Sequence, residues 1–436
     1  MLERDKLIET ALASTWHRQT AEASFDRWLQ ICEQEHWGEL PREIDKMIAV
    51  FGASWYFTRF IYYRGRKSAE LIDSPVISNF DQESILEFLS HILHEEEQEQ
   101  RFEWLRSLKN QVMLCILIRR LCGEESIEEN ELALTRLAIC TLTVAMQIVG
   151  LELNQTENRI AVLGMGRMAG DEMNFGSDLD LIFLYEDTSE DFRLFFSEKI
   201  RLLLRHMSLV TASGVLYDID MRLRPHGTSG TLVTSINSFL EYHQAPRETW
   251  ERQMMTRCSP IIDYQGLAQS SMGQIHELIY KDSYDSSLAR EMLEVRSRVE
   301  DELGSRKGKV DVKRGRGGVM DIDFLTHYLQ LKNAYKYPEL QISSTRKTLK
   351  NLSIHGLITH EHATFLLDTY DFFKRIEACL RLFDMKSVNT FPEKMDNHHA
   401  LVRAMAYTGD KAAQLFLEDF HKRRESVHTI FTNSLA

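Results

Sequence analysis

The chain has 436 residues and a formal net charge of −13, and 43% of its residues are hydrophobic. This hydrophobic share excludes a chain that is disordered throughout, and the length predicts about two to four domains. The acidic balance argues against a nucleic-acid-binding protein, which needs a net basic surface to neutralise phosphates. A local basic pocket remains compatible with the total charge.

Six cysteines are scattered along the chain, and no two share a C-x-x-C spacing. This usage predicts reduced thiols and a cytoplasmic protein. The first ten residues are charged and lack an apolar core, so we expect no signal peptide. The apolar stretch Leu137–Leu151 contains two threonines and a glutamine and is too short to span a membrane. We therefore predict a buried helix there and no membrane partner.

Residues 1–153 have the apolar spacing of helices, and residues 94–99 are best interpreted as a solvated acidic helix face. Helical spacing returns from about residue 285 onward. It is strong over Phe365–Phe383 and Leu415–Phe431.

The segment between these two helical regions differs. Two short apolar runs, Ile160–Leu163 and Leu181–Tyr185, predict buried strands around a glycine-rich loop. A helix is expected over 190–212. Tyr217–Arg224 then alternates strictly, which predicts a strand with Asp218, Asp220, Arg222 and Arg224 on one face. We predict a mostly helical α+β protein, with a small mixed β-sheet core at 154–265 between an N-terminal helical region (1–153) and a C-terminal helical domain (266–436).

Three carboxylates form the sharpest candidate site. Asp178 and Asp180 are two residues apart at the start of a strand, so both face the same side, and Asp220 lies on a neighbouring strand. Three such groups can hold two Mg²⁺ ions, which would clamp the attacking and leaving oxygens of a phosphoryl or nucleotidyl displacement. Asp218 is the alternative third ligand. A lone D-x-D pair is more often a solvated turn, and its setting among strands favours the metal site.

A glycine turn precedes these carboxylates. A tight turn at Gly164-Met165-Gly166 can bring the backbone close to a triphosphate. The spacing to Gly170 is one residue too long for the dinucleotide-binding fingerprint, and no P-loop motif is present.

These features together resemble a known superfamily. Gly166-Arg167, followed after ten residues by Asp178-Leu179-Asp180-Leu181, is similar to the signature of the DNA polymerase β-like nucleotidyltransferases. Within that superfamily the sequence resembles the glutamine synthetase adenylyltransferase family. Four segments carry this resemblance, namely Gly164–Phe183, Tyr217–Val233, Trp250–Arg252 and Lys313–Phe324. The sequence departs from the family pattern at Ala169, where a glycine is usual, and at Asp323, where a glutamate is usual.

The resemblance implies an activity and its participants. Members transfer AMP from ATP to a tyrosine of glutamine synthetase, which regulates nitrogen assimilation, and a second module removes the AMP by phosphorolysis and releases ADP. The chain is long enough for one such module. Three details lean towards the transferring half: Leu179, Leu232–Ser235 and Thr249–Glu251. The removing half, a regulatory module that has lost catalysis and a relative with another substrate remain alternatives. A PII-type signalling protein is a further candidate partner.

The resemblance also implies the roles of site residues. The expected catalytic and metal-binding residues are Asp178, Asp180 and Asp220. The expected nucleotide or phosphate contacts are Gly166, Arg167, Gly176, Ser177, Arg222 and Arg224. A second contact to nucleotide or partner is expected from the loop that holds Lys313, Gly317 and Gly318.

Overall fold

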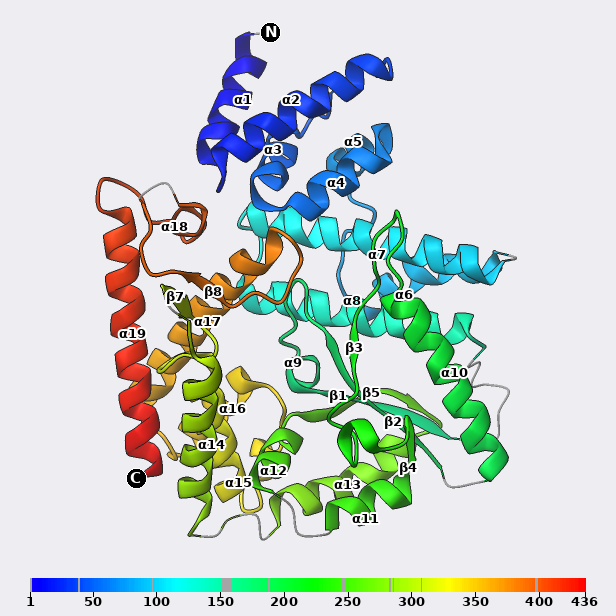
Figure 1. Cartoon of the computed structure of the whole chain (residues 1–436), viewed down its shortest axis with the longest axis vertical. Helices are drawn as coiled ribbons and strands as arrows, with labels where there is room; N and C mark the ends of the chain where they lie inside the picture. The colour runs from blue at the N-terminus through cyan, green and yellow to red at the C-terminus, as the bar shows by residue number, and fades with distance from the viewer. Residues whose placement is uncertain are drawn as a thin grey trace.

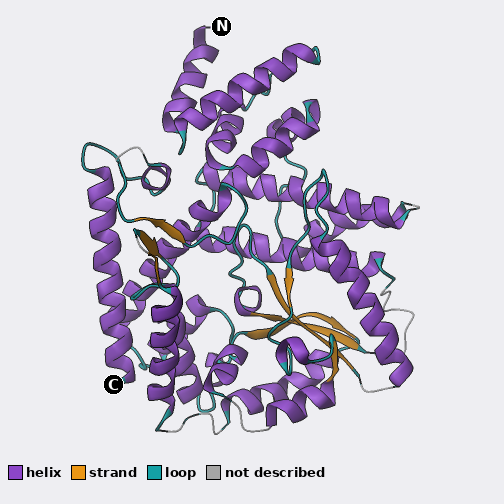
Figure 2. Ribbon diagram, viewed as in Figure 1, coloured by secondary structure: helices purple, strands orange, loops and turns teal. Residues whose placement is uncertain are grey.

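The computed structural model describes residues 2–37, 40–95, 97–150, 159–186, 189–244, 248–281, 284, 286–306, 308–396 and 399–436. Helices make up most of the molecule, and a small mixed sheet lies near its centre (Figure 2). The predicted α+β, mostly helical class is confirmed.

The N-terminal part is helical throughout its described residues, as the sequence predicts. Its elements are α1 (Leu2–Ser14), α2 (Arg18–Gln34), α3 (Ile44–Ala53), α4 (Trp55–Arg64), α5 (Arg66–Asp73), α6 (Gln82–Ser90), the 3₁₀ turn η1 (His91–His94), α7 (Gln98–Leu121) and α8 (Ile127–Ile148). Figure 1 shows α7 and α8 running across the molecule between the first five helices and the sheet.

Helix α8 is buried, as predicted from its apolar stretch. Its start is fixed by a reciprocal cap, in which the Ser126 hydroxyl accepts from the Glu129 N–H and the Glu129 carboxylate accepts from the Ser126 N–H. By length and composition alone the helix could cross a membrane. However, 72% of its most apolar 18-residue stretch is buried inside the protein. The apolar face of α8 therefore belongs to the core. Leu151, the end of the predicted stretch, lies outside the described residues.

The central sheet has the order β3-β2-β1-β5, and β4 pairs with β2 beyond β3. Its strands are β1 (Ile160–Met165), β2 (Leu179–Tyr185), β3 (Ile219–Asp220), β4 (Val233–Ser235) and β5 (Cys258–Tyr264). Strand β1 is antiparallel to β2 and β5, whereas β2 is parallel to β3 and β4. The helices between the strands are α9 (Gly166–Ala169), α10 (Glu190–Ser208), η2 (Gly227–Ser229), α11 (Ile236–Gln244) and α12 (Thr249–Met255).

The sheet separates two hydrophobic cores. In β1, Ile160 and Val162 pack into the cluster formed with α1–α8 and α10. Their neighbours Ala161, Leu163 and Met165 pack into the cluster formed with α11–α19. Strand β2 divides its side chains in the same way. Both faces of the sheet are therefore apolar, which explains why β1 and β2 read as continuous apolar runs in the sequence.

The C-terminal part is again helical, with one small antiparallel sheet that the sequence did not predict. Its elements are α13 (Leu267–Tyr280), α14 (Leu288–Leu303), β6 (Ser305–Arg306), β7 (Lys309–Asp311), α15 (Val319–Asn333), η3 (Pro338–Leu340), α16 (Thr345–Ile354), α17 (His360–Leu382), β8 (Thr390–Pro392), α18 (Ala400–Ala404) and α19 (Ala412–Leu435). The three short strands pair in the order β6-β7-β8.

The strand predicted over Tyr217–Arg224 is much shorter than expected. Only Ile219–Asp220 pairs with β2, and the chain turns immediately afterwards. The Asp220 carboxylate accepts from the Arg222 backbone N–H at 2.8 Å, and the Arg224 guanidinium donates to the carbonyls of Met221 and Thr231 at 2.7 and 2.9 Å. These side chains bond to the backbone groups of a turn, and those groups do not pair with a neighbouring strand. The alternating pattern therefore does not extend the strand.

A buried ion network joins the three regions of the chain. Lys374 and Glu377, both on α17 and fully buried, contact each other at 3.4 Å. Lys374 also contacts Glu131 of α8 at 2.9 Å, and Glu377 contacts Arg167 of α9 at 2.7 Å. Glu131 in turn contacts Arg346 of α16 at 2.8 Å. We call these five residues the α17 ion network.

The charge of Glu377 is essential to this network. Burial alone would raise the pKa of its carboxyl, but Arg167, Lys374 and Arg381 hold that pKa well below its usual range. A carboxylate in this setting compensates cations that water cannot reach. Removing one partner of such a buried set leaves the others uncompensated.

We expect Glu377→Gln to lower the free energy of unfolding by about 3 to 5 kcal/mol at neutral pH, measured by urea unfolding. Because the folded-state pKa of Glu377 is depressed, its stabilisation is present above the ordinary glutamate pKa of about 4.3 and is lost as the pH falls below it. The difference between variant and wild type should therefore shrink in acid. Glu190→Gln, which breaks an exposed pair with Arg193, is the matched control and should unfold like the wild type. Equal urea midpoints for Glu377→Gln and the wild type would contradict the network's role.

Candidate active site at the carboxylate cluster

Four aspartates gather where β2 and β3 begin. The two strands pair in parallel with Asp180 directly opposite Asp220. Asp178 and Asp218 each stand two residues earlier, and the Leu179 N–H donates to the Asp218 carbonyl at 2.9 Å, which keeps the approach to both strands in register. The structure therefore brings together the three aspartates that the sequence singles out, and it adds Asp218, the alternative ligand, at the rim.

The cluster carries an excess of negative charge. Burial, together with the charges of Asp220 and Asp178, raises the pKa of Asp180 to about 6 against the opposing effect of Lys313. Burial and Asp218 likewise raise the pKa of Asp178. Carboxylates that repel one another in a partly buried site are stabilised by a bound cation.

The donor set suits Mg²⁺, which prefers a few carboxylate oxygens together with phosphate oxygens. As the side chains stand, the described residues contain no group of three histidine, cysteine or acidic side chains arranged to hold a metal ion. Asp220 is paired with Arg222, whose Nε lies 2.8 Å from its carboxylate. The Arg222 side chain is 75% exposed, so a competing cation can displace it at little cost.

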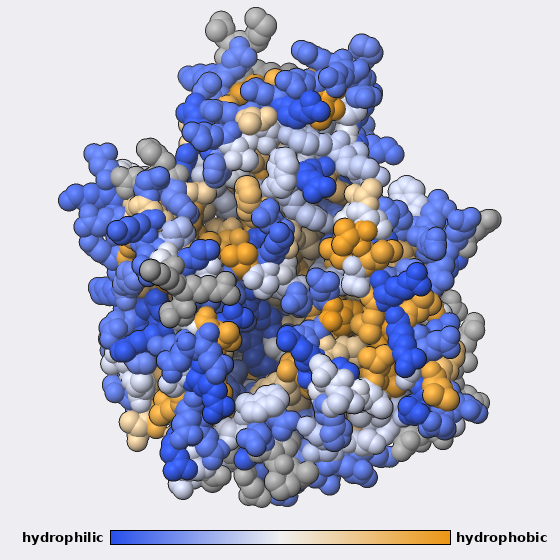
Figure 3. All heavy atoms as spheres, in the orientation of Figure 1, coloured by the Kyte–Doolittle hydropathy of each residue, from blue (hydrophilic) through white to orange (hydrophobic). Residues whose placement is uncertain are grey.

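The glycine turn lies against the carboxylates. Gly166 follows β1 with a φ of +59°, and a Cβ at this position would stand 3.2 Å from Oδ2 of Asp180. A positive φ and this close approach together require glycine. The Gly166 N–H donates to the Arg257 carbonyl at 2.9 Å and is not available to a ligand. The turn therefore contributes space beside Asp180. Figure 3 shows the molecule hollowed near its centre, over α9.

Arg167 does not project freely into this hollow. Its guanidinium pairs with Glu377 at 2.7 Å, and only 16% of the side chain is exposed. Its Nη2 is held by Glu377, and the expected contact with a phosphate stays a prediction. Its charge still acts on the site, because it lowers the pKa of Asp180 and that of Lys313.

Gly176 and Ser177 shape the loop before β2. Gly176 has a φ of +60°, and a Cβ there would stand 2.7 Å from the Met385 carbonyl. The Ser177 hydroxyl accepts from the Asn174 N–H at 3.0 Å and from Arg381 of α17 at 3.3 Å. Both residues therefore position the entry to β2 against the segment after α17.

The loop predicted as a second contact divides into two parts. Lys313 lies near the carboxylates, half-buried, and the charge of Arg167 together with burial lowers its pKa to about 7. Gly317 and Gly318 do not reach the cluster. A Cβ on Gly317 would collide with the backbone of Arg424 in α19, and the Gly317 N–H donates to Asp321 at 2.9 Å. Gly317 lets the loop turn against α19, and the contact of these two glycines with a nucleotide or a partner stays a prediction.

Arg222 and Arg224 also have different partners. Arg222 remains at the cluster through Asp220, whereas Arg224 donates to loop carbonyls between Met221 and Thr231 and is held there. Beside them lies a pocket of about 280 Å³ whose wall includes the half-exposed Trp250. Arg222 therefore stays with the carboxylates and Arg224 organises the turn.

Arg381 is the site residue that the sequence did not reveal. It reaches Ser177 and acts on Asp178, and burial lowers its pKa to about 10. Lys374, Glu377 and Arg381 are spaced three and four residues apart in α17. That spacing puts all three on one face of α17 and is the one signal that could have indicated a buried polar interface.

The sequence matches two family models. The model of the glutamate-ammonia ligase adenylyltransferase family matches residues 44–274. A second model, described as GlnD PII-uridylyltransferase, matches residues 288–435. The first match includes the whole central sheet and the four aspartates.

Curated relatives agree with the first match. Proteins named bifunctional glutamine synthetase adenylyltransferase/adenylyl-removing enzyme include one from Chromobacterium violaceum, 28% identical over 357 residues, which are 80% of this chain and 40% of that protein. One from Burkholderia pseudomallei is 28% identical over 384 residues, or 84% of this chain and 41% of that protein. One from Hahella chejuensis is 32% identical over 228 residues, or 49% of this chain and 24% of that protein. The chain thus spans less than half the length of these relatives.

The electrostatics of the cluster can be measured without any substrate. In metal-free protein we expect the Asp180 carboxyl to titrate near pH 6, followed by ¹³C NMR of labelled aspartate. Asp220→Asn removes a neighbouring negative charge, so Asp180 should titrate at a lower pH in that variant. Glu190→Gln removes a charge outside the cluster and should leave the Asp180 titration where it is. An Asp180 that titrates near 4 in the wild type would show that the carboxylates do not crowd one another.

Proposed function

The chain belongs to the glutamate-ammonia ligase adenylyltransferase family, and from this premise we propose that it is a Mg²⁺-dependent nucleotidyltransferase. Its reaction moves AMP from ATP to a tyrosine of glutamine synthetase. The observation that carries the proposal is the contact of the Gly166 turn with Asp180, directly beside Asp220. A glycine turn and paired carboxylates at one strand end are what a nucleotidyl transfer requires.

Each residue of the cluster has a role in this proposal. Asp178, Asp180 and Asp220 hold Mg²⁺, and Asp220 becomes available when Arg222 swings away. Mg²⁺ bound there would neutralise charge on the transferred phosphate and favour the phenolate form of the acceptor. Lys313 lies where its amine can meet phosphate oxygens, and Gly166 leaves room for them. Arg381 and Ser177 keep Asp178 in place.

Removal of AMP by phosphorolysis is the second candidate. Both reactions displace a group at the α-phosphorus, so the same carboxylates serve either one. Lys313 and the displaceable Arg222 favour this candidate as well, since inorganic phosphate would need cations near the cluster. We prefer the transferring direction on three sequence details: Leu179, Leu232–Ser235 and Thr249–Glu251. A module that has lost catalysis would have no need of the intact Asp178, Asp180 and Asp220.

The surroundings of the reaction are also part of the proposal. The match of residues 288–435 to a PII-uridylyltransferase model supports a PII-type signalling protein as a further partner. All six cysteines are free thiols in the structure, which supports a cytoplasmic location.

Asp180→Asn tests the assignment of the carboxylates. The change keeps the shape and removes the charge that holds the metal, so we expect AMP transfer to fall by at least about 100-fold. Because the pKa of Asp180 is raised, its charge opposes folding at neutral pH, and the variant should melt at the same temperature or higher. Asp26→Asn, an exposed change on α2, should alter neither property. Near-normal turnover in Asp180→Asn would refute the metal assignment.

The direction of the reaction needs a separate experiment. The full chain is mixed with glutamine synthetase and labelled ATP, and in parallel with adenylylated glutamine synthetase and inorganic phosphate. We expect label on the synthetase in the first mixture. ADP formation in the second mixture alone would assign the removing direction. If neither reaction is observed although the glutamine synthetase is intact, the result would favour the regulatory module.

A further inference from the structure

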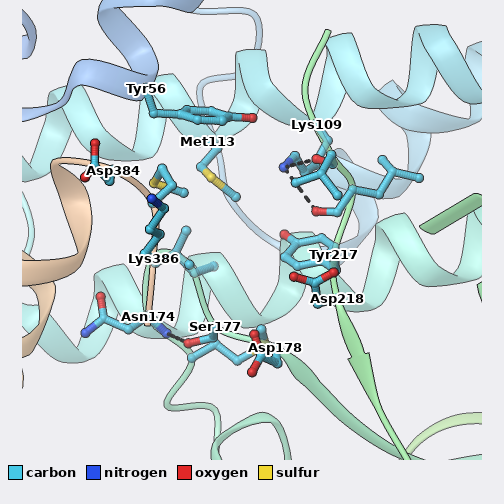
Figure 4. Close-up of a pocket in the computed structure, with 16 residues that line it drawn as sticks. Tyr56, Lys109, Met113, Asn174, Ser177, Asp178, Tyr217, Asp218, Asp384 and Lys386 are labelled. Atoms are coloured by element: carbon cyan, nitrogen blue, oxygen red, sulfur yellow. Dashed lines mark hydrogen bonds between the residues drawn. The ribbon is translucent and has the colours of Figure 1, made fainter. Parts of the chain in front are cut away.

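A second pocket opens on the far side of the aspartates. It has a volume of about 210 Å³ and lies between α7, the loop before β2, the segment before β3 and the chain after α17 (Figure 4). Apolar side chains form much of its wall, and Asp178 and Asp218 lie at its lower edge in the view. The apolar lining includes Met113, Leu134, Met173, Leu216 and Met385.

Tyr217 is the polar group that this pocket leaves unsatisfied. The residue is only 8% exposed, and its hydroxyl has no hydrogen-bond partner among the described residues. Figure 4 shows the hydroxyl directed into the pocket. Lys109 stands over the ring at 5.1 Å but donates to the carbonyls of Val215 and Leu216 at 3.0 and 3.3 Å. A buried hydroxyl without a partner is rare in proteins and indicates a missing ligand group.

The pocket and the Gly166 turn lie at different parts of the aspartate cluster. Tyr217 packs with the α1–α8 cluster. Asp180 is the aspartate beside the Gly166 turn, where a Cβ would stand 3.2 Å from its Oδ2, and Lys313 acts on its pKa. Neither Gly166 nor Lys313 lines the pocket. Asp178 and Asp218, at the strand starts, are the residues common to the cluster and the pocket.

In-line displacement then decides what the pocket receives. The attacking and leaving oxygens lie on opposite sides of the phosphorus. If the leaving phosphates lie at Gly166 and Lys313, the acceptor must approach the phosphorus from across the cluster, where Asp178 and Asp218 line the pocket.

We infer that this pocket receives the phenol ring of the acceptor tyrosine, an inference that rests on the proposed function. The ring packs against Met113 and Met173, and the Tyr217 hydroxyl donates to the phenolic oxygen. In the reaction this oxygen forms a bond to the α-phosphorus, the bond from that phosphorus to pyrophosphate breaks, and the phenolic proton is released to water. In the removing direction the same phenol is the leaving group, so the pocket serves both.

A first experiment examines binding without turnover. Methionine methyl groups labelled with ¹³C report on the pocket through Met113, Met173 and Met385 in the full chain. We expect N-acetyl-tyrosinamide to shift these three methyl signals, and to bind about fivefold more tightly than N-acetyl-phenylalaninamide, which lacks the hydroxyl. A response to adenosine instead would assign the pocket to the nucleoside and overturn the inference. No response to any of the three compounds would overturn it as well.

A second experiment uses turnover. Tyr217→Phe keeps the ring and removes the hydroxyl, so it should raise the KM for glutamine synthetase about five- to tenfold and leave the KM for ATP unchanged. Its melting temperature should not fall, because an unsatisfied buried hydroxyl is removed. The control is Tyr63→Phe, an exposed change on α4. A raised KM for ATP, or no change in either KM, would overturn the inference. If the wild type transfers no AMP, the proposed function fails, and the methyl spectra still decide the pocket.

Discussion

The structure depends on compensating charge that has been taken out of water. Lys374 and Glu377 on α17 are fully buried, and neither could stay ionised there alone. Their partners come from α8 and α9, which are more than 200 residues away in the chain. Each ion pair is tolerable only when all three helices are in place, so one requirement of electrostatics fixes how the helical regions and the sheet meet.

This requirement reaches the carboxylate cluster through shared cations. Arg167 belongs to the α17 ion network and also lowers the pKa of Asp180, while Arg381, on the same helix, holds Ser177 beside Asp178. The excess negative charge of the cluster is thus held in place by a neighbouring excess of positive charge. The total charge of the chain conceals this separation, because opposite charges cancel in a sum wherever they lie.

The sequence predicts the parts of the fold that depend on local pattern. The apolar runs of β1 and β2, the glycine turn and the pair Asp178 and Asp180 are all where it places them. It overestimates the strand through Asp220, because the turn after that residue is made by side chains whose bonding partners alternation cannot indicate. It does not reveal Arg381 or the packing of Gly317 against α19, for a related reason. Their positions depend on contacts between segments far apart in the chain, and no spacing within one segment encodes such contacts.

The division of the sheet between two cores has a consequence for engineering. A strand whose side chains alternate between two different hydrophobic clusters has no face that can be left to water. The aspartate-bearing sheet is therefore not an excisable unit. A fragment cut to residues 160–264 would keep α10 on one face and α11 and α12 on the other, but it would lose the remaining helices of both clusters and expose apolar surface. Grafting the site onto another scaffold would require helical layers on both sides. Evolution of this module by domain shuffling would have to move the helices together with the sheet.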